Sequence, residues 1–278
     1  MRPLTEQVIL ITGATDGLGK AVALQLAYAG ATLLLHGRDE ARGQHTLEEI
    51  RGQTGNTRLS WYRADFAALA HVRALSERLV REQERIDVLV NNAGIGTTLP
   101  GGGARQESED GYELRFAVNY LAPFLLTRLL LPTLRQSAPA RIVNVSSAGQ
   151  APINFRDVML ERRYDGVQAY CQSKLALVMF TFDLAEELAG TGVTANCLHP
   201  ATYMPTKMVL AARGSSVSTI EEGVQATVHL ITAPELDQIS GRYFNGLREA
   251  RAESQAYDRR ARRQLRQLSE QLTGPTGP

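Results

Sequence analysis

The sequence predicts a doubly wound α/β fold, in which a parallel sheet is covered by helices on both faces. Short apolar runs alternate with stretches of helical periodicity along most of the 278 residues, as expected for strands joined by helical crossovers. A glycine-rich loop directly follows the first apolar run, where such folds turn from the first strand into the first helix. The chain length fits one large domain.

Seven apolar runs are the candidate strands of a single seven-stranded parallel sheet. Val8-Ile9-Leu10-Ile11 ends in Thr12-Gly13, which indicates a buried strand followed by a turn. The last run, Arg242-Tyr243-Phe244, is the shortest. The expected strands are residues 8–11, 32–35, 59–63, 86–90, 141–145, 193–198 and 242–244.

Helices are predicted between these strands. Leu18, Val22 and Leu26 recur at helical spacing, and Gly30 closes this element. Three consecutive glycines at 101–103 predict a loop. The expected helices are residues 18–29, 40–50, 72–84, 112–131 and 169–188, with a further one that ends near residue 232.

Composition and charge exclude several classes of protein. Hydrophobic residues make up 44% of the chain, too many for a disordered protein, and the net charge of +1 gives no reason to expect nucleic-acid or membrane binding. Two cysteines, Cys171 and Cys197, are too few for a disulfide framework. The polar start and the short apolar stretch at 121–134 fit neither a signal peptide nor a membrane span. We therefore expect a cytoplasmic protein without a metal site, since the histidines have no ligand spacing.

The residues from 248 onward differ in composition from the rest. Seven arginines lie between residues 248 and 266, with a thin apolar stripe of Leu265, Leu268 and Leu272. This pattern predicts a solvated helix that packs one edge on the domain. No motif supports a nucleic-acid or membrane role for it.

The loop after the first strand reads Thr12-Gly13-Ala14-Thr15-Asp16-Gly17-Leu18-Gly19. A helix that starts here points unpaired backbone N–H groups and its positive dipole end at a phosphate. Glycines let the backbone approach the ligand without a Cβ atom in the way. The spacing differs from the commoner G-x-G-x-x-G, but its place between a strand and a helix favours a dinucleotide site over an ordinary tight turn.

The end of the second strand indicates which dinucleotide is bound. An acidic residue there would bind a ribose 2′-hydroxyl and repel a 2′-phosphate. The chain instead has Gly37, followed by Arg38, whose planar guanidinium suits a phosphate. Asp39 comes next, either as a competing acidic group or as the cap of the following helix. We expect NADP(H) to be favoured over NAD(H).

Tyr170 and Lys174 lie four residues apart, on one face of a predicted helix. A free phenol, with a pKa of about 10, is a poor acid at neutral pH. A cation one turn away would lower that pKa and make the phenol a usable proton donor. Lysine is rare in this chain, since only Lys20, Lys174 and Lys207 occur against 27 arginines. Together with a dinucleotide loop, the pair predicts an enzyme that transfers hydride.

These motifs occur in the order found in the short-chain dehydrogenase/reductase family, which the chain resembles up to its tail. The matched motifs are Thr12-Gly13-x-x-x-Gly17-x-Gly19, Asn91-Asn92-Ala93-Gly94, Asn119, Ser146-Ser147 and Tyr170-x-x-x-Lys174. The resemblance implies a Rossmann fold. Residues 1–247 would be one dinucleotide-binding and catalytic domain, and residues 248–278 a C-terminal helical tail.

The resemblance also implies a role for each matched residue. Tyr170 would be the general acid/base, and Lys174 would lower its pKa and bind the nicotinamide ribose. Ser147 would orient the substrate carbonyl, with Ser146 as the alternative, and Asn119 would hold a water of the proton relay. The expected cofactor-binding residues are Thr12, Gly13, Thr15, Asp16, Gly17, Leu18, Gly19, Arg38, Asp65, Phe66, Asn92, Ala93, Gly94, Tyr170, Lys174, Pro200 and Thr206.

Within the family, the chain resembles the retinol-dehydrogenase-like branch. Tyr170 follows Ser147 by 23 residues, a long spacing, and the segment from Gly241 to Ala250 is similar to that branch's ending. The branch implies NADP(H) and lipophilic aldehydes or ketones, but its usual membrane anchor is not expected here. After the sixth strand, Ala201 replaces the family's glycine and Thr206 comes one residue late, which puts this loop's contact with the cofactor in doubt.

We therefore expect an NADP(H)-dependent carbonyl reductase acting on a small, lipophilic ketone or aldehyde. Two alternatives stay open: a dinucleotide-dependent epimerase or dehydratase, and a non-catalytic NADP-binding sensor. An epimerase usually has a larger C-terminal domain, and a sensor usually lacks the Tyr/Lys pair. Beyond the substrate, no nucleic-acid or membrane partner is expected, and the resemblance allows a homodimer or a homotetramer.

Overall fold

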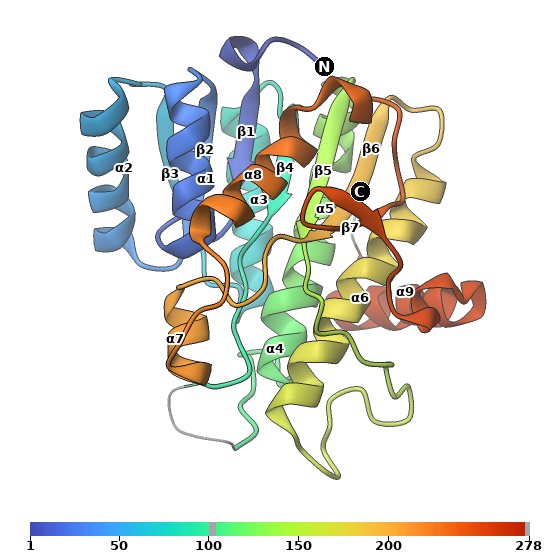
Figure 1. The fold of residues 1–278 in the computed structure, drawn as a ribbon. Helices are drawn as coiled ribbons and strands as arrows, with labels where there is room; N and C mark the ends of the chain where they lie inside the picture. The colour runs from blue at the N-terminus through green and yellow to red at the C-terminus, as the bar shows by residue number, and fades with distance from the viewer. Residues whose placement is uncertain (100–103, 276–278) are drawn as a thin grey trace.

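A computed structural model describes residues 1–99 and 104–275, in which one sheet lies between two layers of helices (Figure 1). The glycines at 101–103 lie outside the described residues. The sheet has eight strands in the order β3-β2-β1-β4-β5-β6-β7-β8. After β3, at one edge of the sheet, the chain returns to form β4 beside β1, so the strand order reverses between β1 and β4. Ligands of such folds bind at the carboxyl ends of the strands near this point of reversal.

The strand bounds follow the sequence prediction closely in the first six strands. They are β1 (Val8–Ile11), β2 (Thr32–Gly37), β3 (Leu59–Arg63), β4 (Val88–Asn91), β5 (Ala140–Val145), β6 (Val193–His199), β7 (Tyr243–Asn245) and β8 (Arg248–Ala250). The doubly wound fold is confirmed and β1 to β7 are parallel as expected, but the sheet has eight strands instead of the predicted seven. The eighth strand, β8, pairs antiparallel with β7. Its residues are largely exposed at the sheet edge, so it has no apolar run by which it could be recognised.

Alternate residues of each inner strand pack on opposite faces of the sheet. In β1, Leu10 belongs to the core on one face, whereas Ile9 and Ile11 belong to the core on the other. Helices α1 (Gly17–Tyr28), α2 (Glu40–Thr54) and α8 (Ile220–Thr232) cover the second face. Helices α3 (Leu69–Glu82), α5 (Ala122–Gln136) and α6 (Gly166–Glu187) cover the first. A strand buried on both faces is continuously apolar, which is why these strands were visible in the sequence.

The helix that leads into α5 is continuous from residue 114 to residue 136. It consists of α4 (Leu114–Phe116), a single π-helical turn (Ala117–Leu121) and α5. By length and composition this helix could cross a membrane, but 83% of its apolar window is buried inside the protein. The π-helical turn contains Asn119, and such turns are frequent at functional sites.

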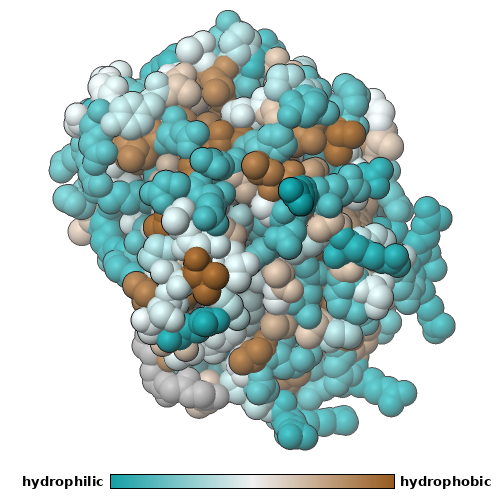
Figure 2. All heavy atoms as spheres, viewed as in Figure 1, coloured by the Kyte–Doolittle hydropathy of each residue, from teal (hydrophilic) through white to brown (hydrophobic). Residues whose placement is uncertain are grey.

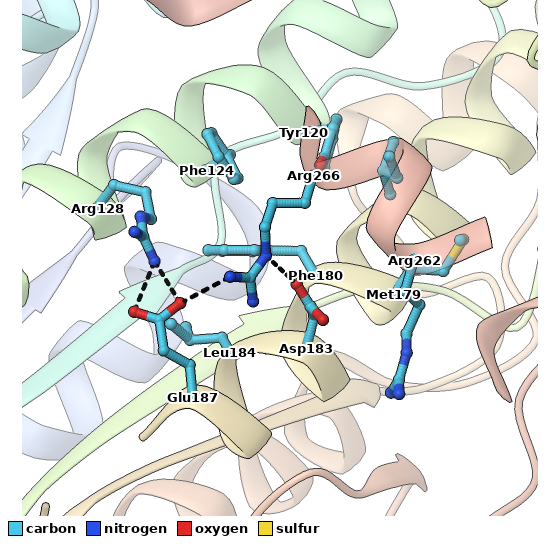
Figure 3. Close-up of a pocket in the computed structure, with 11 residues that line it drawn as sticks. Tyr120, Phe124, Arg128, Met179, Phe180, Asp183, Leu184, Glu187, Arg262 and Arg266 are labelled. Atoms are coloured by element: carbon cyan, nitrogen blue, oxygen red, sulfur yellow. Dashed lines mark hydrogen bonds and ion pairs between the residues drawn. The ribbon is translucent and has the colours of Figure 1, made fainter. Parts of the chain in front are cut away.

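The described residues after β6 contain two α-helices in addition to α8. They are the short α7 (Lys207–Arg213) and α9 (Arg259–Thr273). Figure 3 shows the contact between α9 and the helices α5 and α6. Arg266 donates to Asp183 of α6 and lies 3.5 Å from a carboxylate oxygen of Glu187, which also accepts from Arg128 of α5. Part of the arginine content of the tail thus serves to dock α9 on α6.

Candidate active site

The predicted catalytic residues come together at the carboxyl ends of neighbouring strands. Strands β4 and β5 pair in parallel, with Asn91 beside Asn144, so the loops that follow them lie at the same edge of the sheet. Ser147 follows β5, and α6 carries Tyr170 and Lys174. The fold therefore brings Ser147 beside Tyr170, which follows it by 23 residues in the sequence.

Ser147 and Tyr170 flank Gly149. A Cβ atom at Gly149 would lie 3.4 Å from Ser147 Oγ and 3.7 Å from Tyr170 Cε1, so this glycine lies next to both side chains. Ser146 differs, because its buried hydroxyl donates to the backbone carbonyl of Lys174 at 2.9 Å. Of the two serines, Ser147 is therefore the one that can reach a substrate beside Tyr170.

Lys174 is buried beside Tyr170. Its ammonium donates to the carbonyl of Val145 at 3.0 Å and lies 5.9 Å from the centre of the Tyr170 ring. Burial lowers the pKa of Lys174 to about 8. Burial also raises the pKa of Tyr170, and a hydrogen bond with Ser147 offsets only part of this rise. The structure places the lysine next to the tyrosine as predicted, but the net shift of the tyrosine pKa is upward, not downward.

Asn119 fastens the loop after β4 to α6. Its amide oxygen accepts from the Ile95 backbone N–H at 2.8 Å, and its amide nitrogen donates to the Ile95 carbonyl and to Ser173 Oγ. Ser173 in turn donates to the carbonyl of Tyr170 at 2.7 Å. The side chain of Asn119 thus holds the backbone around Tyr170, and its predicted contact with a relay water stays a prediction.

Thr12 and Asn92 lock the glycine loop against the loop after β4. The buried Thr12 hydroxyl accepts from the backbone N–H groups of Asn92 and Ala93 at 2.9 and 3.0 Å. The Asn92 amide donates back to the carbonyls of Thr12 and Gly13 at 2.8 and 3.1 Å. These two predicted cofactor residues act by shaping the loop.

The glycines of the first loop are required by close backbone contacts. Gly13 has a φ of 68°, and a Cβ atom there would lie 2.8 Å from Ala93 Cα. At Gly19 a Cβ atom would lie 2.3 Å from the carbonyl oxygen of Gly13. Any larger residue would push the loop away from the strand ends. Leu18, between them, is buried in the core of this face.

His36, which was not among the predicted site residues, supports the same loop from β2. Burial lowers its pKa to about 4, so the ring is neutral at pH 7. Nε2 donates to the carbonyl of Ala64 at 3.1 Å, which leaves Nδ1 to accept from Gly13 N–H at 3.4 Å. The ring stacks on Phe66, with centroids 4.3 Å apart. No local sequence signal could reveal a contact that spans 23 residues.

The ends of β2 and β3 form a hollow lined by two arginines and three acidic residues, which we call the Arg38 hollow. Its lining residues are Arg38, Asp39, Glu40, Ala41, Arg63 and Asp65. Arg63 Nε donates to the carbonyl of Arg38 at 3.3 Å, and Asp39 caps α2 through the Arg42 N–H. Of the two interpretations of Asp39, the structure favours the helix cap.

Gly37 explains why no acidic residue stands at the end of β2. A Cβ atom there would lie 2.7 Å from Trp61 and 3.1 Å from Thr15 Cγ2. A carboxylate side chain would therefore collide with the Trp61 ring. The predicted residue Thr15 of the glycine loop thus lies against the end of β2.

The segment after β6 closes over the glycine loop. Pro200 is buried at its start, and Thr206, the N-cap of α7, approaches Gly17 so closely that a Cβ atom there would lie 3.0 Å from Thr206 Cγ2. The one-residue delay in the sequence therefore does not keep Thr206 away from the loop. Met208 of α7 packs on Gly96 in the same way.

Tyr203, before α7, has a φ of 50° and is 46% exposed. Leu210 and Val217 are exposed apolar residues of the same segment. On the face seen in Figure 2, hydrophobic side chains stand singly or in small groups among hydrophilic ones. The segment thus offers apolar contacts beside the site without forming a broad apolar surface.

The described residues fit a nicotinamide dinucleotide. The N-terminus of α1 suits a pyrophosphate, and the Arg38 hollow lies at the end of β2, where the adenosine ribose would be held. A Cβ atom at Gly94 would lie 3.2 Å from Asn119 Oδ1 and 3.4 Å from Lys174 Nζ. Gly94 thus keeps open the approach to Lys174, which would bind the nicotinamide ribose. Within residues 1–99 and 104–275, no group of three or more His, Cys, Asp or Glu could hold a metal ion.

Two further residues, Tyr243 and Cys171, lie near the site, and neither was predicted from the sequence to belong to it. Tyr243 of β7 donates to the carbonyl of Ser147 at 3.1 Å and so fixes the strand end that carries this serine. The thiol of Cys171 has its pKa raised by burial, which agrees with a packing role.

Comparisons with known proteins agree with this geometry. The family model for short chain dehydrogenase matches residues 7–215. Mouse retinol dehydrogenase 13 is 38% identical over 285 residues, covering 96% of this chain and 84% of that protein. An uncharacterized protein from Mycobacterium paratuberculosis superimposes with a TM-score of 0.81 at 29% identity, covering 98% and 95% of the two chains. A Shigella flexneri short chain dehydrogenase complexed with NADP has a TM-score of 0.71 at 25% identity, covering 87% and 98%.

Proposed function

The chain belongs to the short-chain dehydrogenase family of oxidoreductases, and from this we propose that it is an NADP(H)-dependent reductase of lipophilic ketones or aldehydes. The observation that carries the proposal is the convergence of Ser147, Tyr170 and Lys174 at the carboxyl edge of the sheet, beside a glycine loop that suits a dinucleotide.

The side chains divide the work of a carbonyl reduction. When bound, the dinucleotide supplies the hydride. Tyr170 donates the proton to the substrate oxygen, and Ser147 holds that oxygen by a hydrogen bond. Lys174, with a pKa of about 8, is a cation at pH 7 and stabilises the phenolate that Tyr170 becomes after donating its proton.

The preference for NADP(H) rests on the two arginines of the Arg38 hollow. Arg38 is exposed there and has a second guanidinium, that of Arg63, beside it. A 2′-phosphate would gain charge-assisted hydrogen bonds from these donors, whereas a 2′-hydroxyl would gain little. Gly37 places no carboxylate at the position where one would bind a 2′-hydroxyl and repel a 2′-phosphate, although Asp39, Glu40 and Asp65 also line the hollow.

The preference for a lipophilic carbonyl rests on the segment around α7 and on the relatives. Tyr203 and Met208 offer apolar surface beside the site. The similar proteins named retinol dehydrogenase suggest the same class of substrate.

The acid/base assignment is tested with Tyr170→Phe. We expect the variant to bind NADPH like the wild type, because the phenyl ring fills the same space, and to lose most turnover of a panel of lipophilic aldehydes and ketones. NADPH oxidation and NADPH fluorescence measure the two properties separately. A variant with full turnover would refute the assignment, and wild-type protein that binds NADPH without turning over any carbonyl would favour the sensor alternative.

The cofactor preference is tested with Arg38→Ala. We expect NADPH affinity to fall roughly tenfold or more, the value of a charge-assisted contact, while NADH affinity changes little. An equal loss for both dinucleotides would show that Arg38 does not contact a 2′-phosphate.

A further inference from the structure

One of the three lysines, Lys207, connects α7 to the glycine loop. Its ammonium lies 2.8 Å from Asp16 Oδ2, although the side chain itself is 77% exposed. Asp16 is the N-cap of α1, and its other oxygen accepts from Gly17 N–H at 2.8 Å. Lys207 therefore stands at the helix end where a dinucleotide phosphate would bind.

The charges around Asp16 favour an anion. Burial alone would raise the pKa of the Asp16 carboxyl, but Lys207, the Gly17 N–H and Arg42 together lower it below its ordinary value. The carboxylate is thus ionised at neutral pH and has two cations within 3.3 Å, Lys207 and Arg42. Two positive charges against one negative charge leave the cluster net positive beside the positive end of the α1 dipole.

The segment that carries Lys207 is held in place at its base. The backbone N–H groups of Val217 and Ser218 donate to the carbonyls of Tyr203 and Thr202 at 2.9 and 3.0 Å. This pairing closes the segment into a loop, from which α7 projects toward the α1 N-terminus. This backbone pairing therefore holds α7, and with it Lys207, beside the glycine loop.

We propose that Lys207 is a cofactor-binding residue whose ammonium contacts the pyrophosphate of the dinucleotide and so fastens α7 over it. The inference rests on the proposed dinucleotide site. The pyrophosphate is the partner, rather than the 2′-phosphate, because Lys207 stands at the first turn of α1, whereas the Arg38 hollow follows β2. When an anion arrives at this helix end, the long and exposed lysine side chain needs only to turn from Asp16 toward it.

The test compares binding of three ligands to Lys207→Met, measured as dissociation constants with the full chain. The dissociation constants of NADPH and NADH should rise by the same factor, roughly tenfold for loss of one charge-assisted contact. Adenosine 2′-monophosphate, which has no pyrophosphate, should bind as it does to the wild type. Lys207→Arg keeps the charge and should recover most of the affinity for both dinucleotides.

Lys20→Met is the matched control. Lys20 also pairs with a carboxylate, but this is Glu49 of α2 and not Asp16 at the α1 N-terminus, so its loss should leave all three dissociation constants unchanged. Unchanged dinucleotide binding by Lys207→Met would overturn the proposal, as would a loss confined to NADPH or a loss that includes adenosine 2′-monophosphate. Wild-type protein that binds neither dinucleotide would instead refute the proposed function itself.

Discussion

The buried lysine beside Tyr170 should lower the stability of the fold in a way that depends on pH. Lys174 is 5% exposed, and its ammonium has the carbonyl of Val145 as a partner. None of the ion pairs found within the described residues includes it. Burying a charge without a counter-charge is unfavourable, and Lys174→Met removes that charge while nearly conserving volume.

The magnitude follows from the two pKa values of Lys174. Its ordinary value is 10.5 and burial lowers it to about 8. At roughly 1.4 kcal/mol for each pKa unit, the penalty is about 3 kcal/mol below pH 8. Between pH 8 and 10.5 the unfolded chain keeps a proton that the folded chain has lost, so the free energy of unfolding rises with pH. By pH 9.5 the penalty in the wild type should be smaller by about 2 kcal/mol.

Urea unfolding of the wild type and Lys174→Met at pH 7 and pH 9.5 measures this effect. Other titrating groups cancel in the difference between the two proteins, provided that they do not interact with Lys174. We expect the free energy of the variant, relative to the wild type, to fall by about 2 kcal/mol between the two pH values. A relative stability that is the same at both would refute the argument that Lys174 is buried as an uncompensated cation.

Four further substitutions test other parts of the protein. Thr12→Val should lower the free energy of unfolding by about 1–3 kcal/mol, because two partly buried backbone N–H groups lose their acceptor. Chemical denaturation measures this change, and a change below the experimental error would contradict the argument. Ser147→Ala should reduce turnover strongly, whereas Ser146→Ala should leave turnover largely intact, and steady-state kinetics with the reverse pattern would exchange their roles. Arg266→Ala should loosen α9 from Asp183 and Glu187, so hydrogen exchange in α9 should speed up while turnover persists; unchanged exchange would show that these ion pairs do not dock the helix.

The sequence determined the parts of the protein that depend on local pattern. Strands buried on both faces are continuous apolar runs, and helices between them repeat every three or four residues. Tyr170 and Lys174 share a helix face because four residues make about one turn. The glycine loop could be placed because it directly follows an apolar strand. For these features, neighbours in the sequence are also neighbours in space.

The tertiary structure decided the features that depend on residues distant in sequence. β8 is a polar edge strand, visible only by its pairing with β7. His36 reaches Gly13, and Lys207 reaches Asp16, across separations that no local pattern records. The largest difference between the sequence prediction and the structure concerns the pKa values of Tyr170 and Lys174. The sequence showed a cation beside a phenol, but whether water surrounds them depends on packing, and burial raises the pKa of the phenol and lowers that of the ammonium because both charged forms lose hydration.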